Sequence, residues 1–318
     1  MKIVVAGASG FLGSWTAINL ARSHEVVALG RESTDFWRIN NQNNVRKVRI
    51  PFNLWPEFLN DQDPDVLVLA DWSGVANLHR NEMSQIENVD RWVNLLSAYK
   101  GKRLRSVVGF GSQAELGPNS GLIYENTSDN PTTIYGQAKI QARTRLNSIC
   151  EQFGLRFVWM RIFSTYGPLD VGNWLIPSLV DSLSKGLFMR LTAGEQEWSF
   201  LHAHDFAQAI TLVIESSSIH GVINTGNSKT LLIKNVAEKI ANYFDRADLL
   251  GLGEVPYRHD QVMELKPVCE TLSSLGWSPK VSFDAGLIQT IEWLEGKKVG
   301  PLIDSDGQIL DITLSSRP

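Results

Sequence analysis

The chain has 318 residues, of which 43% are hydrophobic, so it can bury one large core or two coupled ones. Its formal net charge is -4, and its lysines and arginines are spread along the sequence, which leaves no basic footprint for nucleic acid. The two cysteines, Cys150 and Cys269, do not form the closely spaced framework of a secreted domain. The composition therefore indicates a compact globular protein and excludes nucleic-acid-binding and disulfide-stapled classes.

The first residues, MKIVVAG, run directly into an expected strand, without the charged leader, apolar stretch and cleavage site of a signal peptide. The longest apolar runs, such as Val66 to Ala70, are the length of strands and fall far short of the ~20 residues that a membrane-spanning helix needs. We therefore expect a cytoplasmic protein that does not interact with membranes.

Short β-branched runs alternate with helical stretches through the first half of the chain. The expected order is KIVVAG, a helix from about Phe11, EVVALG, a helix near Trp55, DVLVLA, a helix around Gln85 to Tyr99, and SVVGFG. This alternation predicts parallel strands with crossover helices, and the nearly continuous hydrophobicity of the strands predicts helices on both faces of the sheet. The fold class is therefore α/β, with a doubly wound parallel sheet.

The second half of the chain has a different rhythm. A helix from Tyr135 to about Phe153 and the strand RFVWMRI lead into STYGPLD, where Gly and Pro break the pattern. We expect a first domain at residues 1–165, with return segments near residues 203–228, and a smaller mixed α/β lobe at residues 166–318. Further helices are expected at residues 175–186, 205–216, 233–244 and 283–295. Residues 299–318 carry the turn signal DSDG and predict a surface tail or a short hairpin.

A glycine-rich segment, GASGFLG, lies between the first expected strand and the first expected helix, which is the context that a dinucleotide fingerprint requires. Glycines let the backbone turn tightly and approach a pyrophosphate, whose charge meets free N–H groups at the helix N-terminus. An ordinary strand-to-helix turn is the alternative interpretation. We assign to the cofactor the residues Gly7, Ser9, Gly10, Phe11, Leu12 and Gly13.

At the end of the second expected strand the chain reads LGRES. An NAD-binding chain of this fold places a carboxylate there for the ribose hydroxyls, but Gly30 stands at that position. Arg31 follows, and its guanidinium suits a ribose 2′-phosphate, which favours NADP(H) over NAD(H). Because Glu32 and Asp35 lie close by, a solvated loop charge is the alternative.

Tyr135 and Lys139 in IYGQAK are four residues apart on an expected helix, so they share one face. A phenol with a pKa of about 10 is a poor base at neutral pH, and a nearby ammonium favours its ionised form. Ser112 ends the strand SVVGFG, where open α/β sheets bind ligands, and its hydroxyl can hold a substrate oxygen beside Tyr135. The alternatives are half-exposed helix residues and a serine in a strand-end turn.

Together, GASGFLG, Ser112 and YGQAK resemble the extended short-chain dehydrogenase/reductase family of nucleotide-sugar epimerases, dehydratases and reductases, whose first domain is a Rossmann domain. The resemblance covers nearly the whole chain and continues through RIFSTYGP, WSFLHAHD, Asn224-Thr225-Gly226, PYRHDQV, LGWSPKVSF and GLIQTIEW. It implies that Tyr135 is the proton donor or acceptor and that Ser112 orients the carbonyl. Lys139 then becomes the partner of Tyr135 and a ligand of the nicotinamide ribose.

The resemblance also implies further binding positions. Asn53 and Leu54 in PFNL stand at the adenine-contacting pair, with Asn53 in place of the family's acid, and Ala70 and Trp72 fall in the loop that flanks the cofactor. Arg258 becomes a candidate pyrophosphate ligand of the substrate, with a surface salt bridge as the alternative. The other candidate substrate-binding residues are Gln113, Ser164 and Trp198.

The chain departs from the family at several of these positions. Ser164 replaces a common asparagine and Trp198 a common arginine, which puts the contacts usually made there in question. Dehydratases place an Asp-Glu pair directly after their hydroxyl residue, whereas this chain has Gln113 and Ala114. An alanine cannot transfer a proton, so we do not expect 4,6-dehydration.

GSQAELGP, the Trp72-Ser73-Gly74 loop and QEWSFLH resemble enzymes that reduce a 4-keto-6-deoxy sugar on a nucleotide. The leading hypothesis is therefore NADPH-dependent reduction of the 4-keto group of a nucleotide-linked 4-keto-6-deoxyhexose, with Tyr135 as proton donor. The alternative is a nucleotide-sugar 4-epimerase that uses the same serine, tyrosine and lysine. A less favoured alternative is a non-catalytic NADP-binding protein that acts through protein contacts.

Two expectations concern metals and assembly. Of the six histidines only His202 and His204 are close, and no further ligands complete a metal set, so we expect no metal. The helix around Gln85 to Tyr99 and the helix that carries Tyr135 resemble the pair that forms a four-helix dimer interface in the family, so we expect a homodimer. Most of the tryptophans are expected to pack in cores, and Trp174 and Trp198 are candidates for the substrate lobe.

Overall fold

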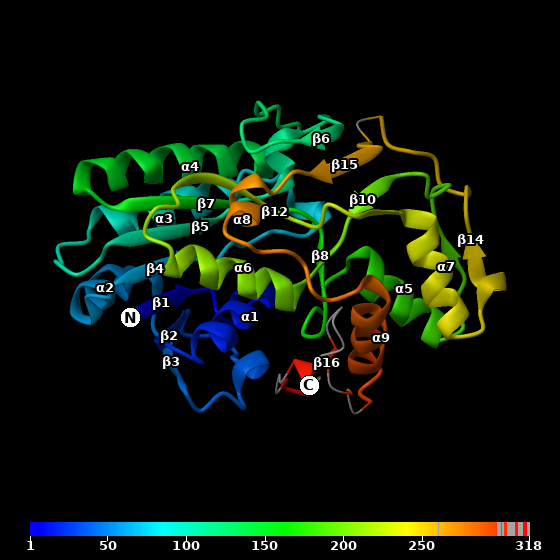
Figure 1. Ribbon diagram of the computed structural model, residues 1–318, viewed down its shortest axis with the longest axis horizontal. Coiled ribbons are helices and arrows are strands. Elements are labelled where there is room, and N and C mark those ends of the chain that lie inside the picture. The colour runs from blue at the N-terminus through cyan, green and yellow to red at the C-terminus, as the bar shows by residue number, and fades with distance from the viewer. Residues whose placement is uncertain (260, 298–299, 301, 304–308, 311–313, 317–318) are drawn as a thin grey trace.

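The computed structural model describes residues 1–259, 261–297, 300, 302–303, 309–310 and 314–316. Its main element is a seven-stranded sheet in the order β12-β7-β5-β4-β1-β2-β3, with every pair parallel (Figure 1). The strands are β1 (Lys2–Ala6), β2 (Glu25–Gly30), β3 (Val45–Arg49), β4 (Val66–Leu69), β5 (Ser106–Phe110), β7 (Arg156–Ile162) and β12 (Gly221–Thr225). Since β2 and β4 flank β1, the strand order reverses there, which is where open α/β sheets bind ligands.

Helices cover both faces of this sheet, because successive side chains of a strand point to opposite sides. One face, which holds Ile3 and Val5 of β1, is covered by α1 (Phe11–Leu20) and α6 (Ala203–Glu215). The other face, which holds Val4 and Ala6, is covered by α2 (Trp55–Gln62), α3 (Gln85–Ser97) and α4 (Ile134–Phe153). The predicted doubly wound α/β sheet is confirmed.

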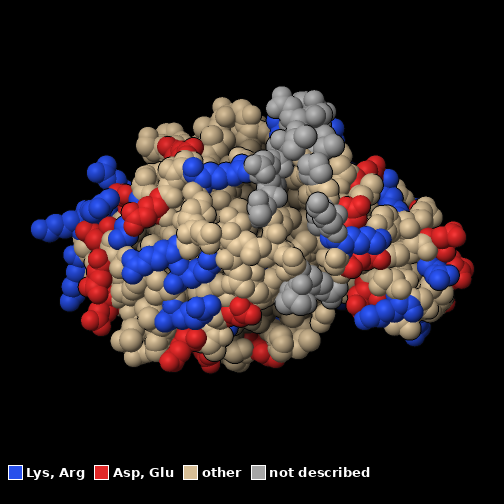
Figure 2. Space-filling model, turned by 90° about the horizontal axis from the view of Figure 1, so that it is seen from below, with Lys and Arg blue, Asp and Glu red and all other residues tan. Residues whose placement is uncertain are grey.

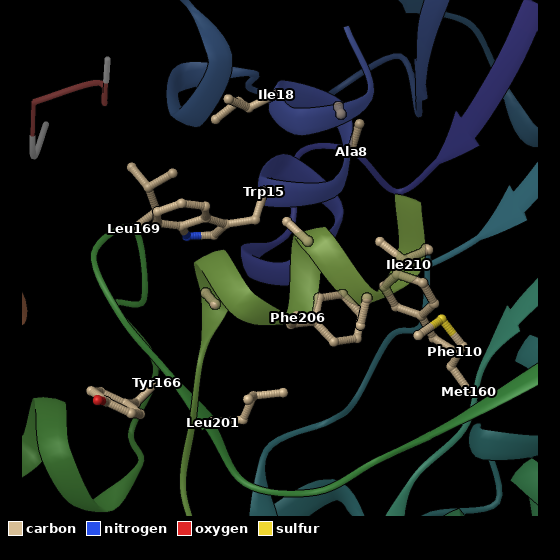
Figure 3. Close-up of a cluster of buried hydrophobic side chains, with 14 of the residues drawn as sticks. Ala8, Trp15, Ile18, Phe110, Met160, Tyr166, Leu169, Leu201, Phe206 and Ile210 are labelled. Atoms are coloured by element: carbon tan, nitrogen blue, oxygen red, sulfur yellow. The ribbon is translucent and has the colours of Figure 1, made fainter. Parts of the chain in front are cut away.

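The core between α1 and α6 ties the two parts of the chain together (Figure 3). Trp15 of α1 is 1% exposed, and its Nε1 donates a hydrogen bond to the carbonyl oxygen of Pro168 at 2.9 Å. Leu169, which follows, lies beside the Trp15 ring. Phe206 of α6 meets Phe110 at the end of β5 edge-to-face, with ring centres 5.3 Å apart. The connection that leaves the large sheet is therefore packed firmly against it.

A smaller lobe of mixed sheet and helices follows this connection (right side of Figure 1). Its four-stranded sheet has the order β13-β10-β15-β6, and β10 is antiparallel to β13 but parallel to β15. These strands are β13 (Thr230–Leu232), β10 (Glu197–Ser199), β15 (Glu264–Pro267) and β6 (Gly121–Ile123). The remaining helices are α5 (Leu175–Ser184), α7 (Ile233–Tyr243), α8 (Glu270–Ser274) and α9 (Phe283–Leu294). The predicted smaller mixed lobe is confirmed.

Short pairs and turns complete the fold. β8 (Thr165–Tyr166) pairs with β11 (Leu201–His202), and β9 (Met189–Arg190) pairs with β14 (Leu250–Gly251). The 3-10 helices are η1 (Trp37–Ile39), η2 (Phe52–Leu54), η3 (Asn77–His79), η4 (Gln113–Leu116) and η5 (Ala247–Leu249). Within the described residues, no helix is both long and apolar enough to cross a lipid bilayer.

The C-terminal stretch contains a hairpin in which β16 (Leu302–Ile303) pairs antiparallel with β17 (Ile309–Leu310). The expected DSDG turn lies outside the described residues. Ser315 is buried, its Oγ donates to the carbonyl oxygen of Arg38 at 3.0 Å, and its carbonyl oxygen accepts from Nε1 of Trp293 at 2.9 Å. The tail is therefore anchored to η1 and α9. On the face seen in Figure 2, Lys and Arg side chains alternate with Asp and Glu rather than forming a patch of one sign.

Candidate active site

The glycine-rich turn between β1 and α1 is packed too tightly for side chains at two positions. Gly7 has a φ of +88°, and a Cβ on it would lie 2.4 Å from the backbone N of Asp71. A Cβ on Gly13, in the first turn of α1, would lie 2.2 Å from the carbonyl oxygen of Gly7. Gly10, the N-cap of α1, is exposed, and a Cβ on it would lie 3.4 Å from the same oxygen, which is an ordinary van der Waals distance. The turn therefore leaves the start of α1 open to solvent.

The open start of α1 suits an anion. The first N–H groups of a helix have no partner within the helix, and no side chain caps those of α1. Together with the helix dipole, these groups attract a phosphate, and the missing side chains of Gly7 and Gly10 let it approach the backbone. Ser9, Phe11 and Leu12 lie in the same turn, so the predicted cofactor residues form one cradle that fits the diphosphate of a dinucleotide.

The adenosine end of such a cofactor would meet the ends of β2 and β3. Arg31 is exposed directly after β2, and its Cζ lies 5.8 Å from the ring centre of Phe52. Arg49, the last residue of β3, is the register partner of Gly30. Two arginines, Arg31 and Arg49, thus lie at the ends of the neighbouring strands β2 and β3. The position of the acid that NAD-binding chains carry is occupied by Gly30.

Asn53 and Leu54 are exposed in η2, next to Phe52. Asn53 lines an open pocket of about 380 Å³ together with Phe52 and Arg91, whose Cζ lies 4.5 Å from the Phe52 ring centre. An exposed amide beside an aromatic face and a guanidinium can bind the edge and the face of a planar base. The predicted adenine position is therefore accessible.

The loop after β4 carries an acid that the sequence analysis did not single out. Asp71 forms an ion pair with Arg91, with 2.9 Å between Oδ2 and Nε, and its Oδ1 accepts from Nε1 of Trp92 at 2.8 Å. Burial raises the pKa of Asp71, and Arg91 opposes this shift. Ala70 donates its N–H to the carbonyl oxygen of Ala6 at 2.9 Å, which fixes the loop to the end of β1. An acid directly after the apolar run VLVLA was the available sequence signal.

Lys139 of α4 is 3% exposed and points under the loop that carries Trp72. Its Nζ donates to the carbonyl oxygen of Phe110 at 2.7 Å and lies 3.7 Å from the ring centre of Trp72. Burial lowers the pKa of Lys139 to about 7, although the charges of Glu115 and Asp71 raise it. The amine can therefore gain or lose a proton near neutral pH.

Tyr135 lies one turn before Lys139 on α4 and is 7% exposed. Burial raises the pKa of Tyr135, while a hydrogen bond with the Ser112 side chain and the charge of Arg80 lower it. Ser112 is buried at the carboxyl end of β5, as the sequence pattern indicates. The structure thus brings Ser112, Tyr135 and Lys139 together beside the glycine cradle, and their catalytic roles stay a prediction.

Ser112 is held by a buried carboxylate that the sequence analysis also missed. Glu115 Oε1 accepts hydrogen bonds from the backbone N of Ser112 at 2.7 Å and from Nε1 of Trp159 at 2.9 Å. Its Oε2 forms an ion pair with Arg143 at 3.1 Å and lies 3.6 Å from Nε of Arg161. Burial raises the pKa of Glu115, and Arg161 is the charge that most opposes this. The spacing Ser-x-x-Glu is that of a capping box and was the available signal.

The predicted substrate residues have different surroundings. Gln113 follows Ser112, and its Oε1 is buried with no hydrogen-bond partner among the described residues, which suits a ligand contact. Arg258 is exposed, and its charge acts on Arg80 near Tyr135. Ser164 is half-buried after β7. Trp198 donates its indole N–H to Val262 within the small lobe, at 3.0 Å, so this donor is already used.

His202 and His204 lie at the start of α6. His202 is the N-cap, and its Nδ1 accepts from the backbone N of His204 at 3.2 Å. The rings of His202 and His204 both pack edge-to-face with the Trp15 ring, with ring centres 5.8 and 6.4 Å apart. They therefore cap and pack a helix, and among the described residues no group of three or more His, Cys, Asp and Glu is placed to hold a metal.

A doubly wound parallel sheet with a glycine-rich turn at the start of its first helix and a Ser-Tyr-Lys group at its carboxyl edge defines an extended short-chain dehydrogenase/reductase. Residues 3–226 match the NAD dependent epimerase/dehydratase family, and the chain belongs to this family. The members of this family are enzymes that use a nicotinamide dinucleotide cofactor.

Several relatives match over most of the chain. An uncharacterized UDP-glucose epimerase of Bacillus subtilis is 24% identical and covers 92% of this chain and 98% of its own length. UDP-N-acetyl-alpha-D-glucosaminuronate decarboxylase of Bacillus cytotoxicus is 25% identical, with 92% and 97% covered. Other relatives match only about half of this chain. A trifunctional dehydratase, epimerase and reductase of Arabidopsis thaliana is 26% identical over 51% of this chain and 24% of its own length, and a dTDP-D-glucose 4,6-dehydratase of Mus musculus is 25% identical over 53% and 49%.

Solved structures share the fold. UDP-N-acetylglucosamine 4-epimerase from Methanobrevibacter ruminantium has a TM-score of 0.79 at 24% identity, with 92% of this chain and 98% of that chain covered. The dTDP-glucose 4,6-dehydratase DesIV from Streptomyces venezuelae, solved with NAD, has a TM-score of 0.81 at 20% identity, with 93% and 97% covered. At these identities the likeness establishes the architecture of both lobes.

Proposed function

We propose that this chain is a nucleotide-sugar 4-epimerase, which inverts the C4 hydroxyl of a hexose carried on a nucleoside diphosphate. The observation that carries the proposal is the convergence of Ser112, Tyr135 and Lys139 beside the glycine cradle. The relatives and structures that match over most of the chain are named as epimerases, a dehydratase or a decarboxylase, which supports this alternative over the 4-ketoreductase hypothesis. The trifunctional relative is also named as a reductase, but it matches only 51% of this chain.

The residues of the site can perform the proton transfers of this reaction. The cofactor, when bound, supplies reversible hydride transfer at the sugar carbon. Tyr135 accepts the proton of the C4 hydroxyl and later returns it to the C4 oxygen. Ser112 Oγ accepts from the backbone N of Ala114 at 3.2 Å, so its one proton is the group that bonds with Tyr135 and can be donated to the C4 oxygen instead when the sugar is bound. Lys139, with a pKa of about 7, favours the ionised form of Tyr135 whenever it is protonated.

Dehydration at C5 and C6 is not supported by the residues next to Ser112. That reaction needs a second acid and base, and Gln113 and Ala114 provide neither. Glu115 is the next carboxylate, but it is fully buried and engaged by Arg143 and the Ser112 backbone. The proposal therefore keeps to chemistry at C4.

The second candidate is NADPH-dependent reduction of a nucleotide-linked 4-keto-6-deoxyhexose, as the sequence analysis expected. It is favoured by Arg31 and by the absence of an acid at Gly30, because reductive steps commonly draw on NADPH. We propose that NADP(H) is preferred over NAD(H) on the same ground. Arg31→Ala should lower the binding preference for NADPH over NADH about tenfold, as the ratio of the two Kd values from calorimetric titration, a loss of roughly 1.4 kcal/mol. Arg46→Ala, which removes a guanidinium paired with Gln62, serves as control and should keep the ratio.

The test is to incubate the purified chain with UDP-, dTDP-, CDP- and GDP-hexoses and to measure C4 epimers by NMR, with Tyr135→Phe as control. Epimer formation without net cofactor consumption, lost in the variant, would establish the epimerase. NADPH oxidation with 4-keto-6-deoxyhexoses and no epimer formation would move the assignment to the reductase. Silence in both assays would favour a non-catalytic dinucleotide-binding protein.

A further inference from the structure

Arg80 is a charged residue beside Tyr135 that neither the motif analysis nor the proposed mechanism uses. It follows η3 in the segment between β4 and α3 and is half-buried. Its Cζ lies 5.4 Å from the ring centre of Tyr135 and 6.0 Å from that of Trp174. Its carbonyl oxygen also accepts the N–H of Tyr135 at 2.8 Å. The backbone and the guanidinium of Arg80 therefore both contact the residue that carries the proposed proton transfer.

Lys139 lies at a similar distance from the phenol but is engaged elsewhere. Its Nζ is 5.7 Å from the Tyr135 ring centre, donates to Phe110 and lies closer to the Trp72 ring. Because burial brings the pKa of Lys139 to about 7, the amine is charged in only part of the molecules at neutral pH. A guanidinium remains protonated at any physiological pH, even where burial lowers its pKa as it does for Arg80.

The charge of Arg80 is not cancelled by an acid among the described residues. Its guanidinium donates one long hydrogen bond, from Nε to the carbonyl oxygen of Val75 at 3.4 Å. The charged groups that act on it are Tyr135 and Arg258, not carboxylates. The positive charge of Arg80 therefore acts mainly on the two aromatic rings beside it, and one of these rings belongs to Tyr135.

We propose that Arg80 is a positioning residue that stabilises the phenolate of Tyr135, so that Tyr135 acts as a base even when Lys139 is neutral. The negative charge of a phenolate spreads into the ring, so a cation over the ring face favours the ionised form over the neutral phenol. This inference rests on the proposed function for its consequence in turnover, but the effect on Tyr135 exists in the protein without substrate.

Other groups that face Tyr135 set the balance against which Arg80 acts. Burial is the strongest influence and raises the pKa of Tyr135, and the charge of Glu115 in η4 raises it further. The Ser112 hydrogen bond and the charge of Arg80 lower it. Lys139 on the same helix faces the ring as described above. Removal of Arg80 therefore leaves the Ser112 hydrogen bond and a partly charged Lys139 to oppose burial.

The direct test is an NMR titration of the chain labelled with [13Cζ]tyrosine, in which Tyr135→Phe identifies the Tyr135 signal. Arg80→Gln should raise the pKa of Tyr135 by about 1 unit, the low end of the range for a charge at this distance, because Arg80 is half-exposed. Arg80→Lys should keep part of the effect. Arg103→Gln removes the same charge at the opposite edge of the sheet, where Arg103 pairs with Asp65, and should leave the Tyr135 signal unchanged. An unchanged Tyr135 pKa in Arg80→Gln, or no titration in either protein below its alkaline unfolding, would overturn the proposal.

The pH dependence of turnover gives a second readout. If Tyr135 is the base, Arg80→Gln should shift the rising limb of the kcat profile upward by the same amount, with roughly tenfold slower turnover below the limb and convergence at high pH. A structural role would slow turnover equally at all pH values and would count against the proposal. If Arg80→Gln shifts the pKa of Tyr135 but the natural chain turns over no sugar, the role of Arg80 is supported and the proposed function is rejected. If the natural chain turns over sugar but the variant shows no shift, the proposed function is supported and the role of Arg80 is rejected.

Discussion

Single glycines control two different properties of the cofactor cradle. Gly7→Ala places a Cβ 2.4 Å from the Asp71 backbone at a positive φ, so we expect a loss of about 2 kcal/mol or more in the free energy of unfolding. Gly10→Ala meets no close contact within the chain and should change stability by only a few tenths of a kcal/mol. It should nevertheless weaken dinucleotide binding, because its methyl group stands where the phosphate approaches. Urea denaturation and calorimetric titration of both variants separate the effects, and equal destabilisation by the two would contradict this account.

The buried His202 makes the free energy of unfolding depend on pH. Burial lowers its pKa to about 3, whereas an unfolded histidine has a pKa of about 6.5, so between these values the unfolded chain binds more protons. The contribution of His202 to stability is therefore complete above pH 6.5 and is lost as the pH falls, by up to about 1.4 kcal/mol per pH unit. His202→Asn keeps an acceptor at the N-cap of α6 but cannot titrate.

The difference in unfolding free energy between the natural chain and His202→Asn should therefore shrink from pH 7 to pH 4, as measured by urea denaturation at each pH. The subtraction removes the opposing influence of Asp170, whose pKa is raised to about 6 by burial. A pH-independent difference for His202→Asn would contradict the assignment of a neutral His202.

Among the elements, the turn η4 depends on one buried carboxylate. Glu115→Gln keeps an acceptor for Ser112 and Trp159 but leaves Arg143 and Arg161 without their buried anion. We expect a loss of about 3 kcal/mol in the free energy of unfolding. Asp129→Asn removes the more exposed partner of the same arginines and should cost below about 1 kcal/mol. Chemical denaturation of the two variants tests this order, and a smaller loss for Glu115→Gln would refute it.

The strands show which elements could be predicted from the sequence. β1, β2, β4, β5 and β7 are buried on both faces and read as unbroken apolar runs. β3 was missed, because an edge strand has one neighbour, and three of the five residues in its sequence VRKVR are cations. β12 follows a helix of the return segment. The sequence analysis used its Asn224-Thr225 pair for the family resemblance but did not predict a strand there. Residues that pair across long sequence distances thus escape a local pattern.

The site divides in the same way. Ser112, Tyr135 and Lys139 were predictable, because each stands at a fixed position relative to a strand end or a helical turn. Arg80 and Asp71 lie on the loop after β4, whose path is set by contacts with α3 and α4 rather than by its own sequence. Their proximity to the reacting groups becomes visible only when the helices are packed.

For the whole molecule, a homodimer through α3 and α4 remains a prediction. These helices lie side by side on the sheet, and Arg145 of α4 pairs with Asp90 of α3 at 2.8 Å on their exposed side. Light scattering during gel filtration should give twice the chain mass at micromolar concentration. Arg145→Glu would place two acids together and should yield monomers, because like charges in a two-fold interface are repeated in both subunits.

Lys185→Glu, directly after α5 of the smaller lobe, changes the charge by the same amount and should leave the dimer intact. A natural chain that elutes as a monomer would reject the interface, and dissociation by Lys185→Glu alone would move it to the smaller lobe.

The seventh strand of the large sheet is also the last to leave the ribosome. β12 pairs with β7 along its length, yet residues 163–220, which include α5 of the smaller lobe and α6, are synthesised between them. Until then β7 presents an unpaired edge whose residues Val158 and Met160 are buried in the finished protein. A chain cut near residue 165 would therefore keep β7 without its outer partner β12, so the first 165 residues do not contain the whole of the large sheet.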